Sequence, residues 1–165
     1  MNYKQKSKIA FKSIGCRTNQ EEIQSLCFIL KSHGHSVVND LSQADIVIIN
    51  TCSVTVNTEL KTKRIIKTII KKISGIKVLV TGCLAQKEKE NLLKIKGINW
   101  VVGNGWKEKI PSIIHNENKK IVHSKIKKDY SHNEPGLKPS QIYPDEYRTR
   151  FLLKIQEGCD YSCSY

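Results

Sequence analysis

Two short runs of consecutive apolar residues constrain the fold of this chain more than any other feature. Asp45–Asn50 has the sequence D-I-V-I-I-N, and Lys77–Thr81 has the sequence K-V-L-V-T. Strands that are apolar at successive positions are buried on both faces, which is typical of a parallel sheet covered by helices on each side. Lys8–Ile14 and Asn99–Val102 are two further strand candidates. The sequence therefore predicts an α/β fold, with a parallel sheet flanked by helices.

Helical patterns fill the stretches between these strands. Thr18 and Glu21 match a capping box, and the apolar periodicity that follows them ends near Gly34. The longest pattern repeats isoleucine at intervals of three and four residues, which gives a helix one apolar face. The three further helices that we expect are Thr55–Ile73, Leu84–Ile95 and Gly105–His115.

The apolar pattern divides the chain into three parts. Residues 7–115 form the predicted α/β domain. From residue 116 the periodicity fades, and lysines, prolines and glycine predict a linker over 116–148. Apolar residues return at Phe151, Leu152 and Leu153, which predicts that 149–165 contains the first strand of a second domain.

The chain is strongly basic, with 28 Lys and Arg against 15 Asp and Glu and a net charge of +13. Such an excess favours a polyanionic partner such as a nucleic acid, because each phosphate contact releases counterions. A lysine-rich compositional bias of the genome is the alternative that composition leaves open.

The six cysteines are expected to be reduced thiols in a cytoplasmic protein. The polar, basic start from Met1 to Lys8 does not match a secretory signal, and no apolar run approaches the ~20 residues of a membrane span. We therefore expect no membrane partner. For thiols in a reducing compartment, metal binding or catalysis is favoured over disulfides.

Three of the cysteines each follow a predicted strand. Cys16 comes after the first strand candidate, Cys52 after the D-I-V-I-I-N run and Cys83 after the K-V-L-V-T run. Loops after the strands of a parallel sheet open onto one edge, where ligands bind, so three sulfur atoms can converge there. Each cysteine also precedes an expected helix start, where backbone N–H groups favour the thiolate. Gly15 and Gly82 precede two of them and let the backbone turn sharply and approach a bulky ligand.

This arrangement predicts a shared metal or cluster site at Cys16, Cys52 and Cys83. For any one of the three taken alone, a buried structural cysteine is the alternative. A structural zinc site normally uses four protein ligands, and a cubane iron–sulfur cluster also commonly uses four cysteines. Three cysteines would leave one iron free for another ligand. Cys27 shares an apolar helix face with Leu30 and is interpreted as a core residue.

A second cysteine pair lies near the end of the sequence. Cys159 and Cys163 are spaced Cys-x-x-x-Cys after Gly158 and the predicted strand. Two cysteines alone do not hold a cubane cluster securely, so this second site is expected to be incomplete in the chain.

Four motifs follow one another along the chain. They are Gly15-Cys16-Arg17-Thr18-Asn19, Asn50-Thr51-Cys52-Ser53-Val54, Gly82-Cys83-Leu84-Ala85-Gln86 and Lys154-Ile155-Gln156-Glu157-Gly158-Cys159. In this order they resemble the radical S-adenosylmethionine methylthiotransferases.

The resemblance implies two [4Fe–4S] clusters. By resemblance, Cys16, Cys52 and Cys83 hold the first cluster in the α/β domain, and its open iron carries the sulfur. Cys159 and Cys163 match two of the three ligands of the second cluster, which binds and cleaves S-adenosylmethionine. The third ligand, the rest of the barrel and an RNA-binding domain are missing from this sequence. The chain is therefore expected to be an N-terminal fragment, cut inside the second cluster motif, that does not complete turnover.

The residues after Cys52 resemble one branch of this family. Val54 and Thr55 resemble the branch that modifies N6-threonylcarbamoyladenosine beside the tRNA anticodon, as do the basic residues that follow them, Lys61, Lys63 and Arg64. The resemblance implies the anticodon stem-loop as partner, with an unidentified reductant protein. The isopentenyladenosine and ribosomal-protein branches remain alternatives, as do a non-catalytic, metal-bearing RNA-binding module and a plain α/β domain without cofactor.

Asn19 and Asn50 lie next to the cysteines in the sequence. We predict that they orient thiolates or donate hydrogen bonds to cluster sulfurs, which tunes the potential of such a cluster. For Asn19, capping of the adjacent helix is the alternative.

Arg64, Lys67 and Lys71 recur on one helix face, opposite the isoleucines. This face is interpreted either as a contact for RNA phosphates or as the solvated side of an amphipathic helix. The five histidines show no metal-ligand spacing and are assigned no role.

Overall fold

The computed structural model describes residues 6–53, 55–115 and 122–123, and its centre is a six-stranded parallel sheet. The strand order is β2-β1-β3-β4-β5-β6, and every neighbouring pair is parallel. The predicted parallel α/β fold is confirmed. The strands are β1 (Lys8–Ile14), β2 (Ser36–Val37), β3 (Ile46–Thr51), β4 (Lys77–Gly82), β5 (Ile98–Val102) and β6 (Val122–His123).

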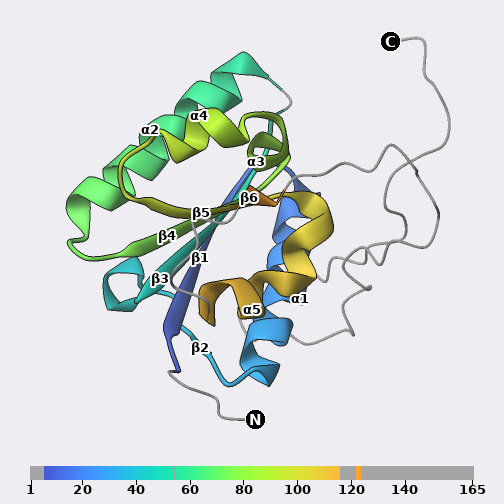
Figure 1. Cartoon of the computed structure of the whole chain (residues 1–165), viewed down its shortest axis with the longest axis vertical. Coiled ribbons are helices and arrows are strands. Elements are labelled where there is room, and N and C mark those ends of the chain that lie inside the picture. The colour runs from blue at the N-terminus through green and yellow to red at the C-terminus, as the bar shows by residue number, and fades with distance from the viewer. Residues whose placement is uncertain (1–5, 54, 116–121, 124–165) are drawn as a thin grey trace, which may run out of the picture.

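Helices cover both faces of the sheet (Figure 1). α2 and α4 lie over one face, whereas α1 and α5 lie over the other. The α-helices are α1 (Arg17–Ser32), α2 (Val56–Lys72), α3 (Cys83–Lys87), α4 (Lys89–Leu93) and α5 (Ile110–His115). Two 3₁₀ helices, η1 (Leu41–Gln43) and η2 (Asn104–Lys109), complete the described elements.

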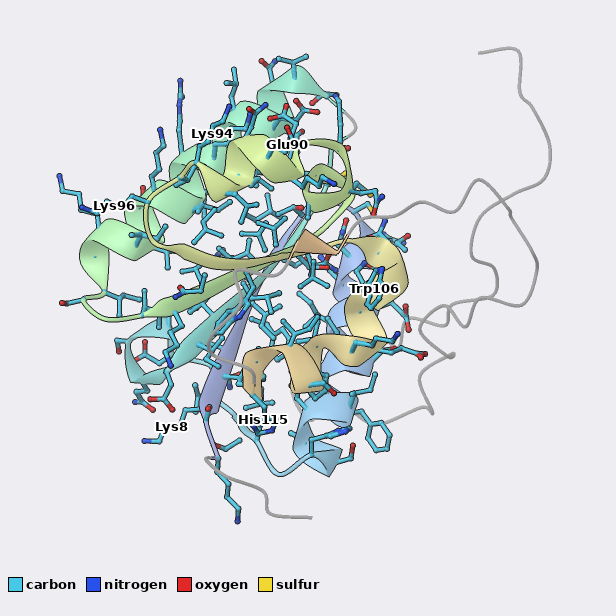
Figure 2. The ribbon with its side chains drawn as sticks, viewed as in Figure 1. Lys8, Glu90, Lys94, Lys96, Trp106 and His115 are labelled. Atoms are coloured by element: carbon cyan, nitrogen blue, oxygen red, sulfur yellow. The ribbon has the colours of Figure 1, made fainter. Side chains whose placement is uncertain are left out.

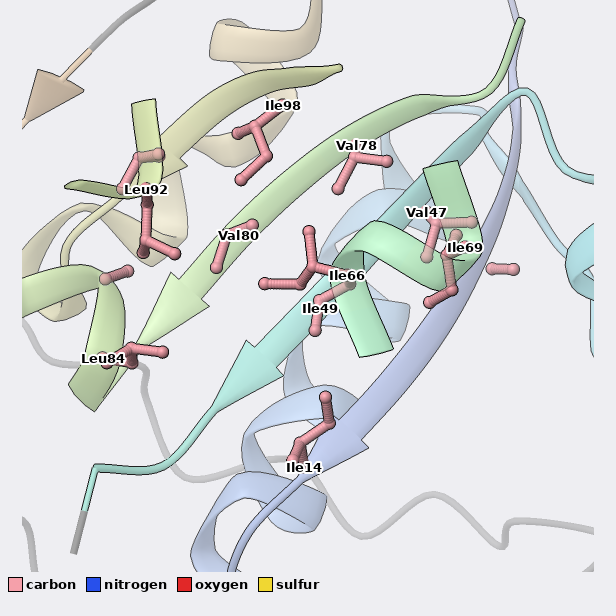
Figure 3. Close-up of a cluster of buried hydrophobic side chains, with 13 residues drawn as sticks. Ile14, Val47, Ile49, Ile66, Ile69, Val78, Val80, Leu84, Leu92 and Ile98 are labelled. Carbon is pink, nitrogen blue, oxygen red and sulfur yellow. The ribbon is translucent and has the colours of Figure 1, made fainter. Parts of the chain in front are cut away.

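The core has two apolar layers because successive strand residues point to opposite faces. In β3, Val47 and Ile49 pack on the α2 side (Figure 3), whereas Ile46 and Ile48 pack on the α1 side. All four are at most 3% exposed. Burying one such side chain stabilises the fold by about 1.5–3 kcal/mol, so the continuous apolar run fixes β3 in the middle of the sheet.

α2 forms where its isoleucine periodicity predicts it. Thr55 caps the helix, since its hydroxyl oxygen accepts the Thr58 N–H at 3.2 Å. Ile66 and Ile69 are buried against the sheet. Because one face is apolar and the other carries exposed charges, the helix can dock in only one orientation.

Helix boundaries differ from the sequence expectations at three places. The predicted Thr18 capping box is wrong: α1 begins at Arg17, with Cys16 as N-cap and Asn19 as its capping-box partner. The predicted helix 84–95 is split into α3 and α4, because Glu88 adopts a non-helical backbone. The predicted helix 105–115 begins as η2 and becomes α-helical at Ile110, so that Pro111 falls in a first turn, where its missing N–H is tolerated.

The sheet also includes β6, which belongs to the stretch predicted as a linker. Val101 and Val102 of β5 pair with Val122 and His123. The predicted second domain over 149–165, including Cys159 and Cys163, lies outside the described residues. Across the part of the chain that the structure describes, no helix combines the length and apolar character that crossing a membrane requires.

Buried His35 and exposed His115 form a pair at the end of the sheet away from the cysteine-bearing loops. The His35 ring is 5.0 Å from the His115 ring, centroid to centroid, and its Nδ1 accepts the Ser7 N–H at 3.3 Å. His35 is only 5% exposed, and its Nε2 has no hydrogen-bond partner among the described residues. Burial lowers the pKa of His35 below its usual 6.5, and positive charge on His115 and His33 lowers it further.

This histidine is expected to make the domain sensitive to acid. Because the folded-state pKa of His35 is depressed, the unfolded chain binds the proton first, and stability decreases as pH falls from about 6.5 through the lower folded value. Urea unfolding at pH 7.5 and pH 5.5 measures the loss, which should be smaller in His35→Gln. The exposed His33→Gln removes only a smaller cause of the shift, after burial and His115, so it should reduce the loss much less. An unchanged pH dependence in His35→Gln would contradict the assignment.

Candidate metal centre

Strand register brings three cysteines to one edge of the sheet. β1, β3 and β4 are neighbours, and Ile14 pairs with Thr51, which in turn pairs with Gly82. Cys16 lies two positions after β1, and Cys52 and Cys83 directly follow β3 and β4. Since neighbouring strands are about 4.8 Å apart, the strand ends that lead to the three cysteines lie within about two strand spacings of one another.

This edge is the one where doubly wound sheets bind ligands. The chain runs from β1 outward to β2 and then returns to place β3 on the other side of β1. In such sheets, ligands bind beyond the carboxyl ends of the strands where the order reverses. Cys16 and Cys52 follow those two strands, so the predicted ligands stand at the switch point of the topology.

The loops that carry the cysteines approach one another closely at two glycines. A Cβ on Gly15 (φ +147°) would lie 2.3 Å from the Cys52 Cβ and 2.7 Å from the Asn19 Oδ1. A Cβ on Gly82 (φ +96°) would lie 2.3 Å from the Thr51 carbonyl oxygen. A side chain at either glycine would clash with the neighbouring loop. The two glycines therefore allow protein loops to approach each other closely.

The three thiols are not equivalent. Cys16 and Cys83 are exposed, whereas Cys52 is buried. Burial raises the pKa of Cys16, but N–H and O–H groups of Asn19 and Thr18 that face its sulfur lower it more, so that the net pKa is below its usual value.

At Cys83 the causes that raise the pKa of the thiol outweigh those that lower it. Neighbouring groups desolvate the inner side of its sulfur and raise the pKa of the thiol, and Cys52 raises it further. The Lys107 charge lowers it only in part. The expectation that a helix start favours the thiolate is therefore wrong for Cys83. Cys52 does not stand at a helix start, because α2 begins after its N-cap at Thr55. Negative charge on Cys52 or Cys16 raises the pKa of Cys83, which agrees with the location of all three residues at one edge of the sheet.

Asn19 and Asn50 form a buried hydrogen-bonded pair beneath this edge. The Asn19 Oδ1 accepts from the Cys16 N–H at 3.2 Å and from its Sγ at 3.1 Å. The Asn19 Nδ2 donates to the Asn50 Oδ1 at 3.3 Å and to the Thr51 carbonyl at 3.2 Å. Asn19 therefore caps α1 and contacts Cys16, whereas the roles of Asn19 and Asn50 toward a thiolate or a cluster stay predictions.

Two further residues of this network had not been selected from the sequence. The Asn50 Nδ2 donates to the Glu22 Oε2 at 2.9 Å, and the same oxygen accepts from the Lys107 Nζ at 2.7 Å. Glu22 was detectable in principle, because it follows Asn19 by three positions on one helix face. Nothing in the sequence distinguishes Lys107 from the many exposed lysines.

The donor set is compatible with a cluster. In the described ranges, no three Cys, His, Asp or Glu side chains converge on one ion position. The ligands of a zinc ion must all reach the same atom. The cysteines of a cubane cluster bind different irons and so stand further apart. Three thiols on neighbouring strand ends, two of them exposed, match the second case.

Comparison with known proteins gives the family. The family model described as Uncharacterized protein family UPF0004 matches residues 8–103. The ribosomal protein uS12 methylthiotransferase RimO of Prochlorococcus marinus (strain MIT 9312) is 32% identical over 176 residues, which cover 100% of this chain and 36% of the relative. The threonylcarbamoyladenosine tRNA methylthiotransferase MtaB of Aquifex aeolicus (strain VF5) is 32% identical over 162 residues, covering 96% and 38%.

The chain belongs to the methylthiotransferase family. A third relative, the tRNA-2-methylthio-N(6)-dimethylallyladenosine synthase of Fervidobacterium nodosum, is 30% identical over 161 residues, covering 96% of this chain and 35% of the relative. This member of the methylthiotransferase family thus spans little more than a third of the length of these relatives. Their names include tRNA and ribosomal-protein substrates, so similarity alone does not select one substrate.

The close approach at Gly82 leads to a stability prediction. Gly82→Ala should lower the free energy of unfolding by about 2 kcal/mol or more, since left-handed strain of about 1 kcal/mol adds to overpacking. Gly75→Ala is the matched control: its φ is +77° but nothing lies within 4 Å of its Cβ, so it should lose only about 1 kcal/mol. Denaturant unfolding measures both, and equal losses would contradict the close approach.

Proposed function

We propose that this chain supplies the cluster-binding domain of a tRNA methylthiotransferase and that Cys16, Cys52 and Cys83 hold its [4Fe–4S] cluster. The observation that carries the proposal is the position of the three cysteines at the switch-point edge of the sheet. A cluster held by three cysteines keeps one iron open, and that iron would carry the sulfur for transfer.

The residues of the chain would divide the work of holding this group. Cys16 and Cys83 are exposed and can reach an incoming cluster, whereas Cys52 is 5% exposed and would anchor its inner side. Asn19 fixes the Cys16 backbone through the N–H contact at 3.2 Å. Gly15 allows the Cys16 and Cys52 loops to touch. Together they would present three thiolates without rearrangement of the sheet.

The second part of the proposal concerns Cys159 and Cys163, which lie outside the described residues. We propose that they contribute to a second [4Fe–4S] cluster that binds S-adenosylmethionine, with a further cysteine supplied elsewhere. Such oxygen-sensitive clusters require reduced thiols, in keeping with a cytoplasmic location.

For the substrate we propose N6-threonylcarbamoyladenosine in the tRNA anticodon stem-loop. The sequence around Val54 and Thr55 supports this branch, as do relatives named for that substrate. Arg64 and Lys67 are exposed on α2, which begins near the cysteine edge. Ribosomal protein uS12 is the second candidate, because several similar relatives are named for it.

Iron binding tests the first part of the proposal. In a Cys159→Ala/Cys163→Ala background, anaerobic reconstitution with iron and sulfide should give about four iron atoms per chain and a brown chromophore. Each of Cys16→Ala, Cys52→Ala and Cys83→Ala should lose most of this iron, with folding checked by circular dichroism. Cys27→Ala is the control and should retain it. Colourless zinc binding by the parent chain would contradict the proposal.

Binding experiments distinguish the two substrates. The anticodon stem-loop carrying N6-threonylcarbamoyladenosine should bind this chain with a strong salt dependence, and a uS12 fragment should not. Arg64→Ala/Lys67→Ala should lower the slope of log affinity against log salt by about one for each RNA phosphate that is no longer neutralised. Lys8→Ala/Lys31→Ala removes the same charge elsewhere and should leave the slope unchanged. Preferential binding of the uS12 fragment would select the second candidate.

A further inference from the structure

A buried ion pair lies beneath the cysteine edge. The Lys107 Nζ on η2 is 2.7 Å from the Glu22 Oε2 on α1, and the two side chains are 3% and 10% exposed. Charged side chains are rarely buried to this extent, and an apolar pair of similar volume is often at least as stable. Stability alone therefore does not explain why this pair is buried here.

The location of η2 places Lys107 close to the cysteines. η2 contacts both α1 and α3, and the Asn104 N–H at its start donates to the Gln86 Oε1 of α3 at 3.2 Å. α3 begins with Cys83. The 3₁₀ helix thus lies between the helices that carry Cys16 and Cys83 at their first turns, and its lysine is directed inward.

The requirement that each donor faces an acceptor fixes the orientation of the Asn50 and Asn19 amides. A carboxylate only accepts hydrogen bonds. Glu22 therefore requires the Asn50 Nδ2 to face it, at 2.9 Å, which directs the Asn50 Oδ1 toward Asn19. That oxygen in turn requires the Asn19 Nδ2, so the Asn19 Oδ1 faces the Cys16 N–H. The Asn19 backbone carbonyl, which accepts from the Asn50 Nδ2 at 3.0 Å, and the Thr51 carbonyl favour the same orientations, so Glu22 is the charged member of the three acceptors that set both amides.

Lys107 adds charge to the same arrangement. It is 2% exposed on η2, which contacts α3, the helix that begins with Cys83, as well as α1. An iron–sulfur cluster held by three thiolates carries net negative charge, and a buried cation near such a group favours its more negative, reduced form.

We propose that the Glu22–Lys107 pair is a positioning element of the cysteine site, in which Glu22 directs the Asn50 and Asn19 amides that anchor Cys16 and Lys107 supplies buried positive charge to the thiolates. This inference rests on the proposed function in that the group bound there is a cluster. The alternative is that the ion pair only holds η2 against α1 and does not affect the cysteine site.

Paired substitutions separate these roles because they leave no lone buried charge. E22Q/K107M removes both charges but keeps an oxygen that the Asn50 Nδ2 can reach. E22L/K107M also removes that oxygen. Lys107→Arg keeps the charge. Lys109→Met removes the same charge from an exposed position on η2, where Lys109 lies over the Trp106 ring at 4.1 Å; Figure 2 labels this tryptophan.

The experiment uses the full chain in the Cys159→Ala/Cys163→Ala background, so that only the three-cysteine site is loaded. Its readouts are the thermal midpoint without iron, the midpoint potential in an electron-paramagnetic-resonance titration, and the half-time of iron loss to a chelator. E22Q/K107M should keep the thermal midpoint and shift the potential to a more negative value. E22L/K107M should show the same potential shift and lose iron several-fold faster. Lys107→Arg and Lys109→Met should match the parent chain.

Two outcomes overturn the inference in different ways. If both double variants fold and match the parent in potential and iron retention, the pair is only a structural connection, and the proposed function stands unaffected. If the parent chain takes up no iron, the proposed function fails and the inference fails with it. Should E22L/K107M not fold, E22Q/K107M decides, because the potential shift is expected in that variant as well.

Discussion

The register between β1, β3 and β4 is the constraint on which the rest of this structure depends. Parallel strands in register must end at one level, and here that level is set by the paired Ile14, Thr51 and Gly82. A slip of one residue would turn every apolar side chain of a strand to the opposite face. The two apolar layers therefore fix the register, and the register in turn fixes where the cysteine loops begin.

Below the cysteine edge, buried polar groups orient individual side chains, which apolar packing cannot do. Apolar contacts are non-directional, so they place the strands but do not orient individual side chains at their ends. The Asn19 and Asn50 amides have one arrangement that satisfies Glu22, Thr51 and the Cys16 N–H together. Because an unsatisfied buried polar group is unfavourable by about 1–3 kcal/mol, this arrangement is strongly selected over its alternatives.

The sequence was sufficient to predict the four central strands of the sheet, but not the edge strands β2 and β6 or the polar support. β1 and β3 follow from apolar patterns that are local, and α2 follows from its isoleucine spacing. The α1 boundary was missed because a cysteine, rather than Thr18, occupies the N-cap position. The Glu22–Lys107 contact joins residues that are far apart in the sequence and whose types are common on surfaces, so only the folded chain reveals it.

The histidine pair was missed for the same reason. His35 follows α1 and His115 ends α5, and they meet only because these two helices share a face of the sheet. Spacing rules for metal ligands detect residues within one element or loop, and they do not detect contacts made by packing of two helices.

The domain does not need a cluster to form its core. Small metal-dependent domains fold only when the metal is bound, because the metal replaces a core that they lack. Here two apolar layers pack on opposite faces of the sheet, and the three cysteines stand beyond the strand ends rather than within either layer. We therefore expect folding and ligand binding to be separate steps, so that residues at the edge can be selected for holding a reactive group. This separation also explains how strained glycines, a buried ion pair and exposed thiols can coexist at one site: the sheet beneath them supplies the stability that they do not.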